Sequence, residues 1–255
     1  MTHWASYPSL EGRSVLITGG ASGIGAQIVR RFCEQKSKVA FIDLDAAAGA
    51  ATAQAIEHDG LAAPLCLACD LRDITALRAA IARAAEVNGP ITVLVNNAAR
   101  DDRHPAAEVT PDYWDERFAV NLRHQFFAAQ AVHPMMQAAG GGSIINMGST
   151  SWMVGQGGMA AYTAAKSAVL GLTRSLARDW GVDGIRVNSL APGWIMTERQ
   201  KSMWLTAEGE RELMTRQCLK RKLVPDDVAR VVLFLAADDS AAMTNQSYIV
   251  DGGWV

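Results

Sequence analysis

The chain has 255 residues, of which 49% are hydrophobic and 20% are charged, and its formal net charge is −2. This length and composition suit a single globular α/β domain with a sizeable core, and the charge excludes the basic footprint of a protein that binds nucleic acid or an anionic membrane. No apolar run is long enough to span a bilayer, and the first eight residues lack the features of a secretion signal. We therefore expect a cytoplasmic protein with neither nucleic-acid nor membrane partners.

Short apolar runs alternate with helical patterns along most of the chain. Helical spacing relates Ile24, Ile28 and Phe32 after the first run, and Thr110 and Pro111 open a long helix as N-cap and first residue. Such runs, apolar on both faces and separated by helices, predict a doubly wound, Rossmann-like parallel sheet with helices on both faces. We expect residues 1–255 to form this one domain. The strands are predicted at residues 14–18, 38–43, 63–69, 91–96, 143–147, 185–190 and 247–250.

A glycine-rich turn follows the first strand. It reads T-G-G-A-S-G-I-G over residues 18–25, and the glycines at 19, 23 and 25 allow the backbone to turn tightly and approach a ligand. The next helix then points its N-terminus at a phosphate group. Because the spacing differs from the fingerprint G-x-G-x-x-G, a glycine turn that binds no nucleotide is the alternative.

A carboxylate ends the second strand, at Asp43. A carboxylate at this place can accept hydrogen bonds from an adenosine ribose, and it would repel a 2′-phosphate. No Arg or Lys occupies Ala21, Ser22, Leu44 or Asp45 to bind that phosphate. The sequence therefore favours NAD over NADP, although an aspartate can also end a strand without binding anything.

Tyr162 and Lys166 are four residues apart at the start of a strongly helical segment. Residues at i and i+4 share one face of a helix, so their side chains can meet. A nearby ammonium group favours the phenolate, and lowering the phenol pKa by roughly three units takes about 4 kcal/mol. The pair is therefore predicted to accept a proton. Because Y-x-x-x-K is common by itself, a surface lysine beside a half-buried tyrosine is the alternative.

The cysteines and histidines give little support for a metal site, and none is expected. Cys66 and Cys69 form a C-x-x-C within a predicted strand, where residues three apart point to opposite faces. We therefore expect neither a shared metal nor a disulfide between them. The five histidines lack the spacings H-x-x-x-H and H-E-x-x-H.

As a set, these motifs resemble the classical short-chain dehydrogenase/reductase family. The match covers roughly residues 10–253 and includes, in the family's order and spacing, the glycine-rich turn, Asp70-Leu71, N-N-A-A at 96–99, Ser149, Y-x-x-x-K and Pro192-Gly193. One departure is Ala99, where the family usually has Gly, and a methyl group there should be tolerable.

The resemblance implies roles for individual residues. Tyr162 would be the catalytic base, and Lys166 would lower its pKa and bind the nicotinamide ribose. Ser149 would orient the reacting hydroxyl, and Asn121 would support a water relay to Lys166, unless it is a helix residue without such a role. NAD would be bound by Gly19, Ser22, Gly23, Ile24, Gly25, Asp43, Leu44, Asp70, Leu71, Asn97, Ala98, Ala99, Tyr162, Lys166, Pro192, Gly193, Ile195 and Thr197.

Substrate selection is expected from segments 100–105 and 151–159 and from a lid at about residues 194–221. Their polar and aromatic side chains suit a polyhydroxylated substrate, because aromatic faces stack on sugar C–H surfaces while polar groups bind hydroxyls. Solvated lid charges are the alternative. The candidate substrate residues are Ser149, Ser151, Trp152, Gln156, Tyr162, Trp194, His104 and Arg199.

Three segments, D-D-R-H, P-G-W-I-M-T-E-R-Q and Q-C-L-K-R, resemble bacterial aldose 1-dehydrogenases of the D-xylose and L-arabinose type within this family. That resemblance implies NAD-dependent oxidation of the anomeric hydroxyl of a pentose or related sugar to an aldonolactone. The Tyr162 phenolate would take the hydroxyl proton, so a raised pH should favour oxidation.

Two other functions stay open. A related enzyme would use the same mechanism to oxidise a secondary alcohol, such as a polyol or a keto-deoxy sugar acid. The chain would otherwise be an NAD-binding regulatory subunit, against which the complete Ser-Tyr-Lys-Asn set argues. The family resemblance also implies a homotetramer formed through the helices that carry Asn121 and Tyr162.

Overall fold

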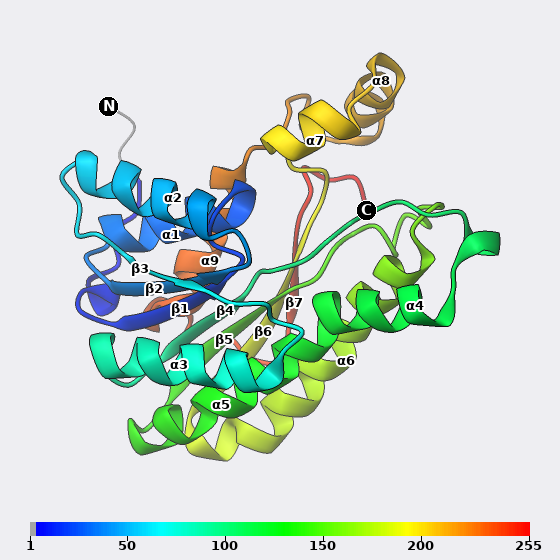
Figure 1. Ribbon diagram of the computed structural model, residues 1–255. Coiled ribbons are helices and arrows are strands. Elements are labelled where there is room, and N and C mark those ends of the chain that lie inside the picture. The colour runs from blue at the N-terminus through cyan, green and yellow to red at the C-terminus, as the bar shows by residue number, and fades with distance from the viewer. Residues whose placement is uncertain (1–3) are drawn as a thin grey trace.

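One parallel sheet forms the centre of the computed structural model, which describes residues 4–255 (Figure 1). Its seven strands pair in parallel, in the order β3-β2-β1-β4-β5-β6-β7, and the reversal between β1 and β4 confirms the predicted doubly wound, Rossmann-like topology. Residues 1–3, part of the N-terminal segment in which no secretion signal is expected, lie outside the described residues. The strands are β1 (Ser14–Thr18), β2 (Lys38–Asp43), β3 (Leu65–Ala68), β4 (Val93–Asn96), β5 (Gly142–Met147), β6 (Ile185–Pro192) and β7 (Ser247–Val250).

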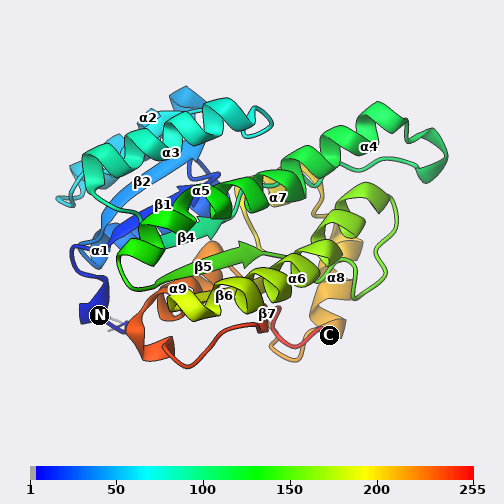
Figure 2. The same cartoon turned by 90° about the horizontal axis from the view of Figure 1, so that it is seen from below.

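Helices cover both faces of the sheet, as predicted (Figures 1 and 2). One face is covered by α1 (Gly23–Glu34), α2 (Ala46–His58) and α9 (Pro225–Ala236). The other is covered by α3 (Ile74–Asn88), α5 (His124–Ala138) and α6 (Ala160–Trp180). Short 3-10 helices occur at η1 (Pro8–Leu10), η2 (Ala106–Glu108), η4 (Gly181–Asp183) and η5 (Asp238–Ser240).

The long helix predicted to open at Thr110 is present, but it is not uniform. It begins as α4 (Pro111–Phe118), passes through a π-helical turn, η3 (Ala119–Arg123), and continues as α5. The Thr110 side chain caps it by accepting a hydrogen bond of 3.2 Å from the backbone amide of Tyr113. A π-helical turn inside an α-helix often marks a functional site, and this one contains Asn121.

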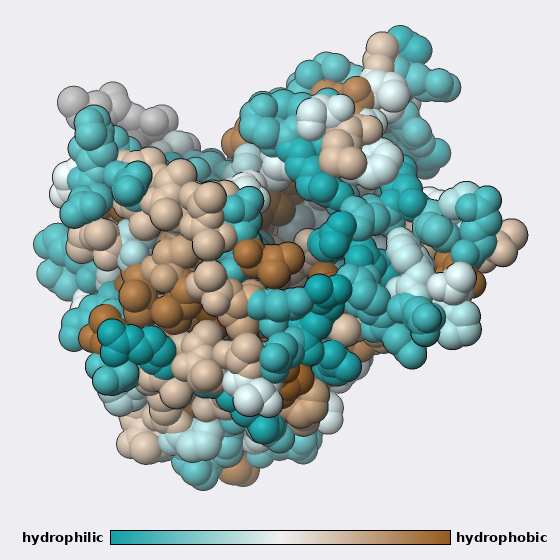
Figure 3. Space-filling view, viewed as in Figure 1, coloured by the Kyte–Doolittle hydropathy of each residue, from teal (hydrophilic) through white to brown (hydrophobic). Residues whose placement is uncertain are grey.

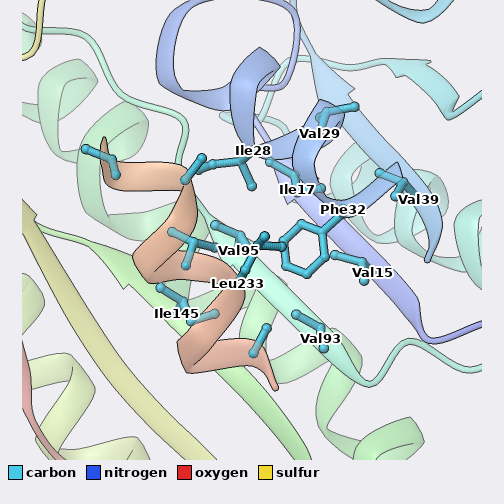
Figure 4. Packing of buried hydrophobic residues seen from close by; sticks show 14 of the residues in the cluster. Val15, Ile17, Ile28, Val29, Phe32, Val39, Val93, Val95, Ile145 and Leu233 are labelled. Carbon is cyan, nitrogen blue, oxygen red and sulfur yellow. The ribbon is translucent and has the colours of Figure 1, made fainter. Parts of the chain in front are cut away.

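Side chains alternate between two cores along the central strands of the sheet. In β1, Val15 and Ile17 belong to the core against α1 and α9, whereas Leu16 belongs to the core against α3 and α5. Figure 4 shows Phe32 of α1 and Leu233 of α9 lying over the strands in the first core. Because both faces of each central strand are buried, these strands appear in the sequence as continuous apolar runs.

Five strand boundaries differ from the predicted ones, and two of them differ by one residue, because β3 ends at Ala68 and β5 begins at Gly142. The edge strand β3 begins at Leu65 rather than at residue 63, because it pairs with β2 only from Ala40 to Asp43. Strand β4 begins two residues later than predicted, at Val93. Strand β6 extends to Pro192, because its last four residues pair with β7.

The 194–221 segment leaves β6 at the carboxyl edge of the sheet. It carries α7 (Glu198–Met203) and α8 (Ala207–Arg216), which project beyond the sheet (Figure 1). The segment returns at Leu223, which forms a bridge with Ile195, and α9 follows. Within residues 4–255, no helix is both long and apolar enough to cross a membrane.

Candidate active site

A large cleft lies at the carboxyl ends of the strands, between the body of the sheet and the 194–221 segment (Figure 3). Its volume is about 1630 Å³. Pockets for small molecules usually measure roughly 300–1,000 Å³, so this cleft has room for a dinucleotide and a second small molecule. It occupies the edge where ligands bind in doubly wound sheets.

The glycine-rich turn forms one wall of the cleft, and two of the glycines that line the cleft have no space for a side chain. Gly19 has a φ of +70°, and a Cβ there would lie 2.7 Å from the Ala98 Cα. A Cβ on Gly25 would overlap the Gly19 carbonyl oxygen and lie 2.6 Å from Asn97 Nδ2. That Nδ2 donates to the carbonyls of Thr18 and Gly19, at 3.1 and 2.9 Å, which joins the turn after β1 to the end of β4.

Asp43 supports the glycine-rich turn as well as facing the cleft. Its Oδ2 accepts a hydrogen bond of 2.9 Å from the Ala21 amide, and its Oδ1 accepts one of 3.1 Å from the Asp45 amide. Each carboxylate oxygen can accept a second hydrogen bond. The carboxylate can therefore hold the turn and still accept hydrogen bonds from a ribose.

A second carboxylate, Asp70, is among the residues predicted to bind NAD, and it lines the cleft. Arg72 donates to it from Nη2 at 2.7 Å and from its backbone amide at 2.9 Å. These hydrogen bonds hold the pKa of Asp70 below its usual value. The charge of Asp70 is therefore balanced within its own turn.

All the residues predicted to bind the cofactor line this one cleft. Ala99, the departure from the family's usual Gly, is exposed along it, so its methyl group is tolerated there. The lining set is Gly19, Ser22, Gly23, Ile24, Gly25, Asp43, Leu44, Asp70, Leu71, Asn97, Ala98, Ala99, Tyr162, Lys166, Pro192, Gly193, Ile195 and Thr197.

Three of the four predicted catalytic residues meet in the same cleft. Ser149 follows β5, and Tyr162 and Lys166 lie one turn apart on α6. The Ser149 hydroxyl is oriented by Ser151, whose backbone amide donates to it at 3.1 Å and whose hydroxyl accepts from it at 3.0 Å. Lys166 Nζ donates to the Met147 carbonyl at 2.7 Å and lies 5.8 Å from the centre of the Tyr162 ring.

The predicted lowering of the Tyr162 pKa is wrong for this arrangement of side chains. Burial raises the pKa of Tyr162 to about 12, Asp101 raises it further, and a hydrogen bond with Ser149 acts in the opposite direction. Burial also lowers the pKa of Lys166 to about 7, so its amine is only partly charged at neutral pH. Desolvation therefore outweighs the attraction between phenolate and ammonium that the spacing alone suggested.

Asn121, the fourth predicted catalytic residue, does not line the cleft. It is fully buried in the π-helical turn. Its Oδ1 accepts from the Arg100 amide at 2.9 Å, and its Nδ2 donates to the carbonyls of Arg100 and Arg117, at 3.2 and 2.9 Å. The side chain therefore fixes the chain that follows β4, and its part in a water relay stays a prediction.

Most, but not all, of the predicted substrate residues reach the cleft. Two do not line it, namely His104, whose ring stacks on Tyr113 at 4.4 Å, and Trp152. Trp152 lies in a series of turns, in which the carbonyls of Thr150 and Ser151 accept hydrogen bonds from backbone amides at residues 153–156. These turns bring Gln156, and not Trp152, to the cleft. The lining substrate candidates are Ser149, Ser151, Gln156, Tyr162, Trp194 and Arg199.

Several lining residues were not among the predicted site residues, and they include Asp101, Arg103, Gln200 and Trp204. The Arg103 guanidinium lies 4.7 Å from the centre of the Trp204 ring. The Gln156 amide, with its oxygen toward Arg103, accepts from both terminal nitrogens at 3.2 and 3.1 Å. Their segments were singled out as substrate-selecting, but nothing local in the sequence showed which side chains face inward.

The cysteines are free thiols, and Cys69 lies just beyond β3 rather than within it. In the described part of the chain, no group of three or more His, Cys, Asp or Glu side chains is placed to hold a metal ion.

Known proteins resemble this chain over nearly its full length. A family model described as enoyl-(acyl carrier protein) reductase matches residues 19–255. A probable galactose dehydrogenase of Rhizobium meliloti (strain 1021) is 49% identical over 98% of this chain and 97% of its own length. A D-xylose 1-dehydrogenase of Caulobacter vibrioides (strain NA1000 / CB15N) is 46% identical over 98% of each. The crystal structure of a 3-oxoacyl-(acyl-carrier protein) reductase from Brucella melitensis ATCC 23457 superposes with a TM-score of 0.91 at 33% identity, covering 100% of this chain and 98% of that one.

Proposed function

The chain belongs to the short-chain dehydrogenase/reductase family, and from this premise we propose that it oxidises the anomeric hydroxyl of an aldose to an aldonolactone, with NAD as cofactor. The observation that carries the proposal is one cleft in which Ser149, Tyr162 and Lys166 meet beside a wall of polar and aromatic side chains. The names of the two similar curated proteins, a galactose and a xylose dehydrogenase, support a sugar as substrate.

The glycine-rich turn fits a dinucleotide, because any side chain at Gly19 or Gly25 would collide with the protein itself and the backbone can therefore approach a pyrophosphate closely. The carboxylate of Asp43 lines the cleft next to this turn. It favours NAD, because it would repel the 2′-phosphate of NADP.

Tyr162 is the proposed base, and it takes the proton of the anomeric hydroxyl. Ser149, oriented by Ser151, hydrogen-bonds that hydroxyl and the carbonyl oxygen that forms from it. When bound, NAD accepts the hydride from the same carbon, and its positively charged nicotinamide favours the phenolate. Lys166 supports the base and the nicotinamide ribose, and Asn121 supports a water relay to Lys166. Because burial raises the pKa of Tyr162, oxidation accelerates as the pH rises above neutrality.

The 194–221 segment is the proposed lid of this single domain. Its Trp194, Arg199, Gln200 and Trp204 line the cleft together with residues that follow β4 and β5, so movement of the segment would open and close the substrate end.

A homotetramer is also part of the proposal. The outer surface of α4, η3, α5 and α6 carries a groove of about 330 Å³ lined mostly by apolar side chains, namely Phe118, Leu122, Arg123, Phe126, Phe127, Ala168 and Leu172. Apolar grooves of this kind suit contacts between subunits. Light scattering tests the assembly, and a monomeric mass would reject it. The free thiols suit the reducing cytoplasm, where we propose that the enzyme acts.

A panel of aldoses and polyols, each supplied with NAD or NADP and followed by the absorbance of the reduced cofactor, tests the function. We expect turnover of aldoses with NAD and an aldonolactone as product. If the enzyme turns over only alcohols whose oxidation gives ketones, the substrate is a polyol or a keto-deoxy sugar acid and not an aldose. Inactivity across the panel despite tight NAD binding would identify a regulatory subunit.

A further inference from the structure

Two adjacent aspartates that follow β4, Asp101 and Asp102, have different surroundings. Both accept hydrogen bonds from Arg199 of α7, Asp101 from its Nε at 3.3 Å and Asp102 from its Nη2 at 2.7 Å. Only Asp101 lines the cleft. Both aspartates therefore hold α7, but only Asp101 also faces the cleft.

The Asp102 carboxylate binds three arginine side chains. Besides Arg199, it pairs with Arg117 at 2.7 Å and with Arg100 at 3.0 Å. The Asp102 carboxylate lies outside the cleft and is surrounded by three guanidinium groups. These contacts explain its role, which is to anchor α7 to the loop after β4.

Asp101 is held in place by α7, yet it keeps capacity to accept hydrogen bonds. Its Oδ2 accepts from Gln200 Nε2 at 2.6 Å, and the Gln200 Oε1 in turn accepts from Trp194 Nε1 at 2.9 Å. The side chain is only 19% exposed. Each carboxylate oxygen can accept two hydrogen bonds, so both oxygens have one site left beyond Gln200 and Arg199.

The Asp101 carboxylate also lies near the reacting group. It lines the same cleft as Ser149 and Tyr162, and its charge reaches Tyr162 strongly enough to raise the pKa of that phenol. A substrate positioned at Tyr162 therefore extends past a fixed, partly buried acceptor.

We propose that Asp101 binds the substrate directly, by accepting a hydrogen bond from a sugar hydroxyl other than the one that is oxidised. This inference rests on the proposed function and narrows its substrate class. A neutral polyhydroxylated molecule supplies the second donor that a simple alcohol lacks.

A thermodynamic cycle between the protein and its substrate tests the contact. We compare kcat/KM of the wild-type chain and the Asp101→Asn variant on the best sugar and on its deoxy analogues, each lacking one hydroxyl. Because asparagine has no charge and only one acceptor oxygen, which Gln200 and Arg199 also compete for, the hydrogen bond from the sugar should be lost or weakened, and kcat/KM for the parent sugar should fall roughly 10- to 100-fold. For the analogue that lacks the bound hydroxyl the loss should be less than about 3-fold, because interacting groups are not additive.

The Asp102→Asn variant is the matched control, and it should reduce kcat/KM by the same factor for the parent sugar and every analogue. If Asp101→Asn also reduces all of them equally, Asp101 is only a lid anchor and the inference is overturned. Melting temperatures of both variants identify any loss that comes from unfolding.

Failure of the proposed function can be distinguished from failure of the Asp101 contact by the substrates that the wild-type chain oxidises. If the wild-type chain oxidises a polyol and no aldose, the aldose assignment fails, and the same cycle run on that polyol and its deoxy analogues still decides the role of Asp101. A wild-type chain inactive on both classes rejects the function and the substrate contact together.

Discussion

The two ends of the cleft are built from different parts of the polypeptide. At the cofactor end, the glycine-rich turn brings backbone atoms to the surface, because Gly19 and Gly25 have no space for a side chain. The buried Thr18 hydroxyl supports this turn by accepting hydrogen bonds from the amides of Asn97 and Ala98, at 3.0 and 3.1 Å. At the substrate end, side chains form it, and they come from distant segments. The residues of the Asp101–Gln200 hydrogen bond are 99 positions apart in the chain.

This difference separates what is constant in the fold from what can change. A surface made of backbone depends on a short local motif, and a single Cβ can disrupt it. A surface made of side chains can alter its hydrogen-bonding groups through one substitution while the sheet beneath stays the same. Substrate choice should therefore follow residues such as Asp101, and cofactor binding should follow the glycine-rich turn.

The largest effect is expected at Tyr162, which stands between the two ends. The Tyr162→Phe variant removes the only hydroxyl that the mechanism assigns as base, so kcat should fall about 100- to 10,000-fold, while NAD binding measured by calorimetry is retained. The Tyr248→Phe variant, on β7 and outside the cleft lining, is the control and should keep its activity. Near-normal turnover by Tyr162→Phe would remove the proposed base.

A smaller effect is expected from adding a methyl group at the cofactor end. In Gly25→Ala the new Cβ meets the Gly19 carbonyl and Asn97 Nδ2, and such overpacking should weaken NAD binding roughly 10- to 100-fold. The Gly181→Ala variant, where a Cβ meets no atom within 4 Å, should bind NAD normally. Equal affinities for the two variants would show that the glycine-rich turn does not approach the cofactor.

Cofactor preference should change less. The Asp43→Asn variant keeps an oxygen for the Ala21 amide but loses the charge, so the preference for NAD over NADP should drop about 10-fold. The Asp45→Asn variant keeps the cap of α2, where the side chain accepts from the Ala48 amide at 2.9 Å, and serves as control. If Asp45→Asn, and not Asp43→Asn, lowers the preference for NAD, the carboxylate that binds the ribose is Asp45.

The smallest effect, a shift in pH dependence, should come from the substrate end. The Asp101 carboxylate raises the pKa of Tyr162, so the neutral asparagine in Asp101→Asn should lower it. The alkaline rise of kcat, measured at saturating sugar, should then occur at lower pH than in the wild-type chain. The Asp102→Asn variant should show the alkaline rise of kcat at the same pH as the wild-type chain. A rise at higher pH in Asp101→Asn would contradict the proposed effect of Asp101 on the pKa of Tyr162.

The sheet and the cofactor end were predictable because their signals are local. Buried strands are continuous apolar runs, and the turn from Thr18 to Gly25 has its glycines where the backbone requires them. The π-helical turn around Asn121 was not predicted, because no residue type in this segment marks the place where a helical turn takes up an extra residue.

The substrate end was only partly predictable. The direction of a loop side chain depends on turns and on partners elsewhere, so His104 stacks on Tyr113 instead of lining the cleft. Asp101, which lies in the loop after β4, was missed because its partner Gln200 lies on α7, 99 positions away in the chain. The pKa of Tyr162 was assigned the wrong direction, because its burial is a property of the folded cleft and not of the spacing to Lys166.

Transfer of an isotope from the sugar to the cofactor tests the proposed reaction most directly. The wild-type chain is supplied with NAD and an aldose that carries deuterium on its anomeric carbon, and the products are identified by NMR. We expect the deuterium on the nicotinamide C4 of the reduced cofactor and an aldonolactone without deuterium. Reduced cofactor without deuterium, beside a dicarbonyl sugar that is oxidised at a secondary hydroxyl and keeps the deuterium on its anomeric carbon, would contradict oxidation at the anomeric carbon.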